Sequence, residues 1–305
     1  MAVEVYVTPP DGFFAAGVDE RRAVLDRIAD TGIDGLFYAD HVSFRNGAGM
    51  DGLILLAGLS QLHPTLGVQI GVYLLPLRHP VLVARQLSTL WELAPGRISF
   101  GVGIGGEDRH EVEACEVDPS TRGRRCDESL EVLQRLLAGE TVTHHGRFFH
   151  LDAVLIRPTP VPPIPVYIGG RSDAALRRTG RYGQGWIGAW CSVERFSAAV
   201  RLSAEAAGEA GRGEVAWFHQ LQPWVGVGPD RDTARTAVAT AMERFYGVPF
   251  AAFERYVPYG PPEEVAEALA PYVAAGARRL NITACPAAGT DAVEAVGRIR
   301  ALLAR

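Results

Sequence analysis

Hydrophobic and polar positions alternate along this chain with two different periods. Short apolar runs rich in β-branched residues are typical of buried strands, and each leads to a longer segment whose apolar residues recur every three or four positions, as on one helix face. The pattern predicts strands over residues 3–8, 35–39, 66–75, 98–104, 166–168, 185–189, 215–227 and 279–284. It predicts helices over residues 19–31, 53–62, 80–92, 122–137, 173–182, 193–210, 231–244, 262–275 and 291–303.

The order of these elements predicts the fold class. Apolar strands that alternate with helices are typical of a parallel sheet with covered faces, and eight of them favour an α/β TIM barrel, (β/α)₈, over an open sheet. We expect residues 1–305 to form a single domain. The proline-rich segment 157–165 would be the alternative domain boundary, but it runs directly into a strand and is better interpreted as a stiff external loop. The aromatic segment 247–262 is a candidate lid.

The amino-acid composition excludes some classes of chemistry and makes some classes of partner unexpected. All thirty basic residues are arginine, so the chain has neither a Schiff-base lysine nor the lysine of a phosphate-binding P-loop. The net charge of −5 gives no electrostatic reason to expect nucleic acid or an anionic membrane as a partner. The apolar runs are too short to span a bilayer, and no signal peptide is expected. The four cysteines are too far apart for a disulfide framework or a thiolate metal site, which fits a cytoplasmic location.

A candidate catalytic pair follows the second predicted strand. In a barrel of this kind the active site lies at the carboxyl ends of the strands. Residues 35–39 are apolar and lead directly to Asp40 and His41, a carboxylate beside the side chain that most readily exchanges protons near neutral pH. The alternative is a strand that simply reaches solvent, with Asp40 capping the next segment.

Glycines mark the end of the fourth predicted strand. Gly101, Gly103 and Gly106 satisfy G-x-G-x-x-G, the dinucleotide fingerprint, but the charged residues that follow do not suit a tightly packed helix. Glycines inside a strand instead let a flat ligand approach the backbone closely. Glu107 is then a polar group at the rim and a third candidate catalytic residue, with plain surface solvation as the alternative.

A phosphate site is predicted at the end of the fifth strand. Gly169 and Gly170 lead through Arg171 and Ser172 into a helix, so backbone N–H groups and the positive end of the helix dipole converge there. The alternative is that Ser172 only caps the helix. Trp186, near the next strand, could stack on a planar ring, although most such aromatics belong to a core. The adjacent His144 and His145 lack metal-ligand spacing and are interpreted as a loop, and no metal site is expected.

Several of these stretches closely resemble the bacterial luciferase-like superfamily. The resemblance spans most of the first two thirds of the chain, and the final third fits more loosely. The matching stretches are 74–106 (LLPLRHPVLVARQLSTLWELAPGRISFGVGIGG), 127–133 (DESLEVL), 146–148 (GRF), 163–170 (PIPVYIGG), and residues 172, 175–178, 182–183, 185–186 and 260–265. One departure is Gln184, where the family usually has Asp.

The resemblance implies a (β/α)₈ barrel with insertions that binds coenzyme F420, a deazaflavin, or alternatively reduced FMN. It places Asp40 and His41 beside the reactive face of the ring, with His41 as general acid or base and Asp40 orienting it or contacting the ring. It also implies a non-proline cis peptide bond on or next to Tyr73–Leu74. The remaining implied contacts are Gly105, Gly106 and Glu107 with the ring and its polyol chain, and Gly169, Gly170 and Ser172 with the phosphate.

Three functions follow from this reading. The favoured one is an oxidoreductase that transfers a hydride between F420 and a small organic substrate. The second is a two-component monooxygenase that uses reduced FMN from a partner flavin reductase. The third is a flavin-binding protein without catalysis, because a fold and a site do not guarantee an activity. Family members are often dimers, so a homodimer is one alternative for an oligomeric state that the sequence leaves open, and residues 219–224 and 245–259 are expected to line the substrate side.

Overall fold

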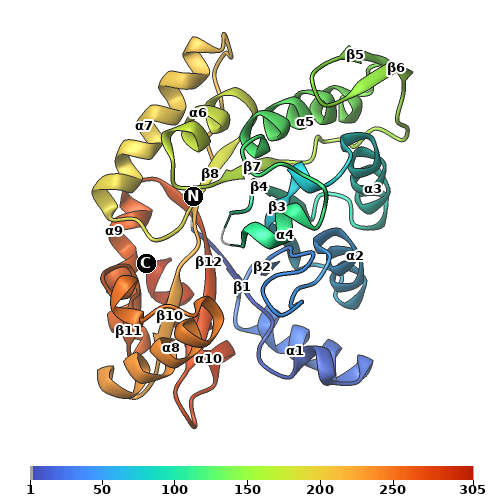
Figure 1. The fold of residues 1–305 in the computed structure, drawn as a ribbon. Coiled ribbons are helices and arrows are strands. Elements are labelled where there is room, and N and C mark those ends of the chain that lie inside the picture. The colour runs from blue at the N-terminus through green and yellow to red at the C-terminus, as the bar shows by residue number, and fades with distance from the viewer. Residues whose placement is uncertain (1–2, 107, 305) are drawn as a thin grey trace.

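Eight parallel strands form a closed barrel in the computed structural model, which describes residues 3–106 and 108–304 (Figure 1). Each strand pairs with the next, and β12 pairs with β1, where Glu4 lies opposite Arg279 and Val7 opposite Ile282. The predicted TIM barrel is therefore confirmed. Its strands are β1 (Glu4–Val7), β2 (Gly35–Tyr38), β3 (Gly67–Leu74), β4 (Ile98–Gly103), β7 (Val166–Gly169), β8 (Gly185–Gly188), β9 (His219–Leu221) and β12 (Ala277–Pro286).

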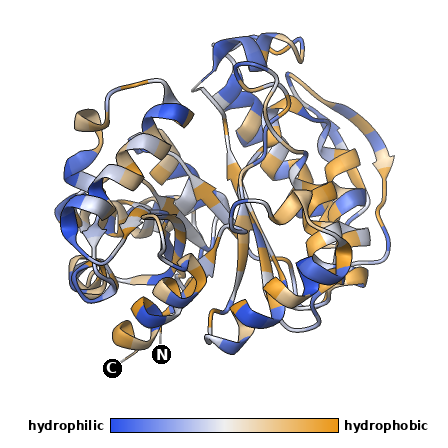
Figure 2. Ribbon diagram, turned by 90° about the horizontal axis from the view of Figure 1, so that it is seen from below, coloured by the Kyte–Doolittle hydropathy of each residue, from blue (hydrophilic) through white to orange (hydrophobic). Residues whose placement is uncertain are grey.

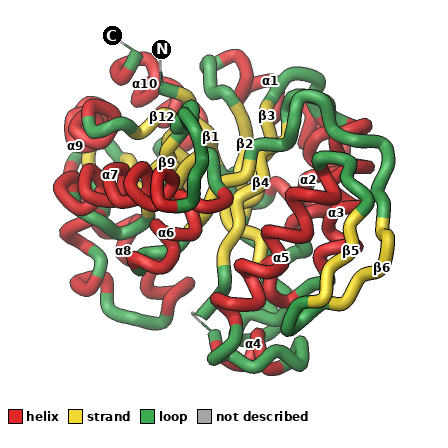
Figure 3. Tube along the Cα trace, turned by 90° about the horizontal axis from the view of Figure 1, so that it is seen from above, coloured by secondary structure: helices red, strands yellow, loops and turns green. Residues whose placement is uncertain are grey.

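Helices surround the barrel (Figure 3). Each predicted helix is found, with ends within two residues of the prediction. Apolar positions gather along the strands and along helix faces (Figure 2), as expected where amphipathic helices cover a barrel. The helices are α1 (Val18–Asp30), α2 (Gly52–Leu62), α3 (Pro80–Leu93), α5 (Arg122–Leu137), α6 (Asp173–Tyr182), α7 (Val193–Glu209), α8 (Arg231–Tyr246), α9 (Pro262–Ala274) and α10 (Ala292–Leu303), together with the short α4 (Arg109–Glu113), which was not predicted. In the parts of the chain that the structure describes, none of the helices has the length and hydropathy needed to cross a membrane.

The predicted strand 215–227 is wrong in its length, because the chain changes sheets within it. It is divided at Pro223, which has no N–H to donate to a strand ladder. β10 (Trp224–Val227) pairs with the last residues of β12, with Trp224 opposite Thr283, and with β11 (Tyr259–Gly260). The end of β12 therefore extends beyond the barrel and forms a wall above its carboxyl end.

An antiparallel hairpin inserts between α5 and β7. It consists of β5 (Val142–His145) and β6 (His150–Val154) and lies outside the barrel beside α5 (Figures 1 and 3). The expectation of a loop at His144 and His145 is wrong, since both residues belong to β5. Glu128 of α5 anchors the hairpin by accepting the N–H groups of Phe148 and Phe149. The segment 157–165 that follows is external and irregular, as predicted.

The segment 247–262 does not form the expected lid in the described structure. It contains two 3₁₀ turns, at Phe250–Ala252 and Glu254–Tyr256. The Phe250 side chain is buried in a second apolar cluster with residues of α8. Burial of this aromatic residue fixes the segment against α8.

Candidate active site

A large cavity opens at the carboxyl ends of the barrel strands. Its volume is about 1700 Å³, above the roughly 300–1,000 Å³ of ordinary small-molecule sites, so it has room for two molecules. Residues at the carboxyl ends of β1, β2, β3, β4, β7, β8, β9 and β12, or in the loops that follow these strands, line it, together with Trp224 of β10 and residues of α8. The position agrees with the rule that TIM-barrel sites lie at this end.

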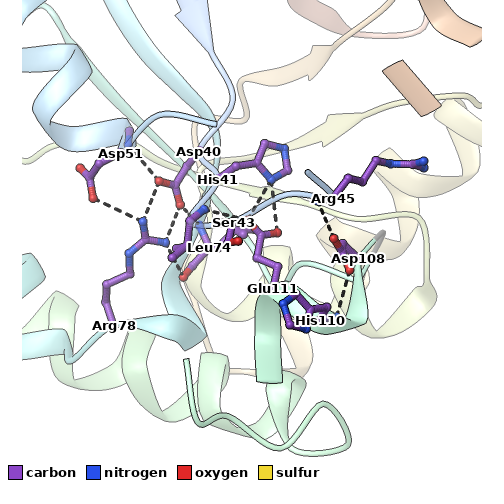
Figure 4. Close-up of polar contacts among 12 residues, drawn as sticks. Asp40, His41, Ser43, Arg45, Asp51, Leu74, Arg78, Asp108, His110 and Glu111 are labelled. Carbon is purple, nitrogen blue, oxygen red and sulfur yellow. Dashed lines mark hydrogen bonds and ion pairs between the residues drawn. The ribbon is translucent and has the colours of Figure 1, made fainter. Parts of the chain in front are cut away.

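His41 lies on the cavity wall and is held by Glu111. Its Nδ1 is 3.2 Å from Oε1 and 3.3 Å from Oε2 of Glu111, whose side chain is 2% exposed (Figure 4). Glu111 also accepts the backbone N–H groups of Val42 (2.7 Å) and Ser43 (3.3 Å), which fixes the loop that carries His41. An imidazole held in this way through Nδ1 keeps its other nitrogen, Nε2, available for proton transfer.

Asp40 does not orient His41, contrary to one of the predicted roles. Both of its oxygens bind Arg78, with Nη1–Oδ2 at 2.6 Å and Nη2–Oδ1 at 2.8 Å (Figure 4). They also accept the N–H groups of Gly52 and Leu74, each at 2.9 Å. Burial raises the pKa of the Asp40 carboxyl, whereas the Arg78 guanidinium and the two amides act in the opposite direction. Asp40 thus joins the ends of β2 and β3 to the start of α2 and is a positioning residue.

The phosphate site predicted at the start of α6 falls on a turn that lines the cavity, residues 169–172, which we call the anion corner. Ser172 caps the helix by accepting the Ala175 N–H at 3.3 Å, and the first amides of a helix lack partners within the helix. Gly170 has φ +126°, and a Cβ there would lie 2.8 Å from the Ala175 Cβ. A Cβ at Gly169 would lie 2.6 Å from a methyl group of Val72. Only glycine therefore leaves this corner open to a ligand.

Trp186 braces this corner from outside the cavity lining, whereas Arg178 is part of that lining. The Trp186 indole donates to the Gly170 carbonyl oxygen at 2.7 Å, so this predicted ring contact supports the turn and does not itself line the cavity. Arg178 of α6 binds Asp127 at 2.6 Å and lies at the cavity edge. Arg171 is exposed, and its guanidinium lies 5.1 Å from the centre of the Trp190 ring.

The glycines after β4 form a second open edge. Gly105 has φ +68° and Gly106 φ +134°, conformations that disfavour other residues. The Arg122 guanidinium would lie 3.2 Å from a Cβ on Gly106. Among the described residues, the buried Nε of Arg122 has no hydrogen-bond partner. It is therefore available to donate a hydrogen bond to an anionic ligand beside Gly106. Glu107, a predicted catalytic residue, lies outside the described residues.

The non-proline cis peptide is Gly71–Val72, two bonds before the predicted Tyr73–Leu74. The register between β3 and β4 shifts between Ile70 and Tyr73, the part of the strand that contains this bond. Tyr73 is fully buried against Phe100 and Arg78, and it is Gly71, Val72 and Leu74 that line the cavity. Of the two residues on this strand that were predicted to bind the coenzyme, Leu74 lines the cavity and Tyr73 does not.

Sequence reasoning missed Glu111, Arg78 and Arg122. Glu111 belongs to the charged run after Gly106, whose charge does not suggest a packed helix, and its spacing of 70 residues from His41 carries no local signal. An apolar residue beside it, Val112, is fully buried and was the available hint that this run packs inward. The described residues contain no cluster of side chains that could hold a metal ion.

Comparisons with known proteins agree with this architecture. A protein of Mycobacterium tuberculosis without an assigned activity is 34% identical over 165 residues, which are 53% of this chain and 57% of that protein. The F420-dependent glucose-6-phosphate dehydrogenase of Beutenbergia cavernae is 32% identical over 188 residues, 61% of this chain and 53% of that enzyme. The matched region is thus about half the length of each of these relatives.

A solved structure and a family model cover more of the chain. The structure of an F420-dependent secondary alcohol dehydrogenase in complex with an F420-acetone adduct has a TM-score of 0.84 and covers 100% of both chains, at 18% identity. At this identity the likeness concerns the fold. The model of the family described as luciferase-like monooxygenase matches residues 12–257. The chain belongs to the luciferase-like monooxygenase family.

Proposed function

We propose that this protein is an oxidoreductase that transfers a hydride between coenzyme F420 and a small organic substrate. The observation that carries the proposal is that two features lie at two sides of one cavity. One is the His41 imidazole, which is hydrogen-bonded to Glu111, and the other is the glycine-lined anion corner. The relatives named as F420-dependent dehydrogenases support the choice of coenzyme.

The residues present fit a phosphorylated, flat coenzyme. A phosphoryl group suits the amides at the start of α6, beside Gly170 and Ser172. The unpartnered Arg122 Nε adds a cationic donor near Gly106. A planar ring suits the backbone at Gly71 and Val72, where the strand presents small side chains to the cavity. We infer that these residues would hold the coenzyme.

The coenzyme, when bound, would supply or accept the hydride, and the chain must then handle the proton. His41 is the group for this role, because Glu111 holds its Nδ1 while Nε2 remains free of other hydrogen bonds among the described residues. A donor–acceptor pair of this kind can deliver a proton to an alkoxide or take one from an alcohol. Asp40 and Arg78 keep the loop between β2 and α2 in place.

Coenzyme titration of the purified protein tests the proposal. We expect F420 to bind at least tenfold more tightly than FMN in calorimetry, and reduced or oxidised F420 to be consumed anaerobically when a substrate is present. Tighter binding of reduced FMN, with oxygen consumption, would instead support the two-component monooxygenase. Tight binding of either coenzyme without turnover of any substrate would support a binding protein.

A further inference from the structure

The cavity continues beyond His41 into a compartment whose wall is a chain of aromatic rings. The His41 ring lies 4.4 Å from Phe44, and Phe44 stacks on Phe245 at 5.5 Å. Phe245 in turn contacts Trp224 at 5.7 Å and Tyr246 at 4.8 Å, measured between ring centres. Every one of these residues lines the cavity. The proton-transfer group thus stands at the end of a continuous aromatic surface.

The same helix that carries Phe245 and Tyr246, α8, presents small side chains to the cavity in its preceding turns. Thr236, Ala237, Thr240 and Ala241 line the cavity, with the spacing of three and four that places residues on one side of a helix. Such side chains leave room for a flat molecule beside the rings. The exposed fraction of Phe245, 38%, shows that the aromatic wall reaches the cavity mouth.

Charged side chains border this compartment, and two of them, Arg45 and Arg171, lie against aromatic rings. The Arg45 guanidinium lies 5.3 Å from the Phe44 ring and donates to the Tyr246 carbonyl oxygen. Arg171 lies against the Trp190 ring. Arg244 also lines the wall, on an exposed turn of α8. A strongly charged substrate would lose hydration against the rings, whereas an apolar ring would gain contact area.

We propose that this compartment selects an uncharged, apolar substrate that carries an aromatic ring, and not a sugar phosphate. The inference rests on the proposed function, because it assigns the second occupant of the same cavity. Its binding can nevertheless be measured without the coenzyme.

Calorimetric titration with 2-acetylnaphthalene and with glucose 6-phosphate tests it. We expect 2-acetylnaphthalene to bind the protein at least tenfold more tightly than glucose 6-phosphate and to quench tryptophan fluorescence. Phe245→Ala should weaken 2-acetylnaphthalene binding roughly tenfold, because it removes the central ring of the wall. Trp224→Phe, which keeps an aromatic ring, should weaken it less. The matched control is Trp217→Phe, whose tryptophan does not line the cavity and should leave the affinity unchanged.

The outcomes separate this inference from the proposed function. If F420 binds and glucose 6-phosphate binds as tightly as 2-acetylnaphthalene, the substrate class is wrong while the coenzyme assignment stands. If 2-acetylnaphthalene binds with the expected loss in Phe245→Ala but F420 does not bind, the compartment is as proposed and the oxidoreductase assignment is wrong. An unchanged affinity in a folded Phe245→Ala protein, checked by circular dichroism, overturns the inference.

Discussion

At the scale of single residues, the proposed proton transfer depends on the hydrogen bond between His41 and Glu111. Two oxygens of one carboxylate lie within 3.3 Å of Nδ1, and the same carboxylate accepts two backbone N–H groups of the loop. Glu111 therefore sets both the orientation of the imidazole and the path of the chain that carries it. Removing either residue should impair proton transfer, but for different reasons.

We predict that His41→Ala lowers kcat by roughly a hundredfold or more, since a positioned acid or base contributes about 10²–10⁴. The Kd for F420 should change by less than about threefold, because the phosphoryl site at the start of α6 and Arg122 lie on other parts of the chain. Glu111→Gln should cause a smaller loss and alter the pH profile of kcat. His145→Ala, an exposed histidine on the outer hairpin, is the matched control. Unchanged turnover in His41→Ala would refute the assignment.

Asp40 should matter for stability more than for chemistry. Asp40→Asn leaves the Arg78 guanidinium without its buried carboxylate, and breaking such a pair costs about 3 kcal/mol or more. We predict a loss of this size in the free energy of unfolding measured with urea. Asp19→Asn, in the exposed pair with Arg22, should change it by less than about 1 kcal/mol. Equal effects of the two substitutions would show that the buried pair is not a structural anchor.

At the scale of elements, we expect the turn from β7 into α6 to bind the phosphoryl group through its backbone N–H groups. Gly170→Ala places a side chain in a conformation that L residues rarely adopt and pushes its Cβ to 2.8 Å from the Ala175 Cβ. We predict at least tenfold weaker binding of F420, measured by calorimetry. Gly211→Ala shares the positive φ (+68°) but has no neighbour within 4 Å, so it controls for backbone strain alone. If the two variants bind F420 alike, the phosphoryl group does not use this turn.

The contact between β8 and β9 should make stability depend on pH. The His219 Nδ1 accepts the Trp186 N–H at 3.1 Å, and burial lowers the pKa of His219 to about 4. The unfolded chain, with a pKa near 6.5, then binds more protons between pH 6.5 and 4, so stability falls as the pH falls. The free energy of unfolding that is lost through the protonation of His219 is about 3 kcal/mol. His219→Asn keeps an acceptor and should remove that part of the slope in urea unfolding at pH 8 to 4, whereas an unchanged slope would contradict the burial argument.

The elements differ in how far sequence could predict them. The glycines and the capping Ser172 form a local pattern, so the start of α6 was predicted where it lies. The break at Pro223 depends on a change of partner strand, which hydrophobic periodicity does not register. The partnership of His41 with Glu111 joins residues 70 apart through tertiary packing, and the partner of Asp40 was equally hidden. Local chemistry was thus predictable, whereas the choice of partner at long range was not.

At the scale of the whole molecule, barrel closure brings three groups of loops around one cavity. The loops after β2 and β4 supply the His41 and Glu111 pair, and the turn after β7 supplies the anion corner. β10 and α8 supply the aromatic compartment. Pairing of β12 with β1 holds the first and last of these groups at a fixed separation. We therefore predict a defined order of occupants: the phosphoryl tail at α6, the ring beside Val72, and the substrate toward Phe245.

A crystal structure of the protein with F420 bound is the most direct measurement of this arrangement. We predict that the phosphoryl oxygens accept N–H groups between Gly170 and Ala174, and that the deazaflavin ring lies against Gly71 and Val72 with His41 Nε2 facing the substrate side. A phosphoryl group bound elsewhere in the cavity, or a ring that lies beyond the reach of His41, would contradict the account.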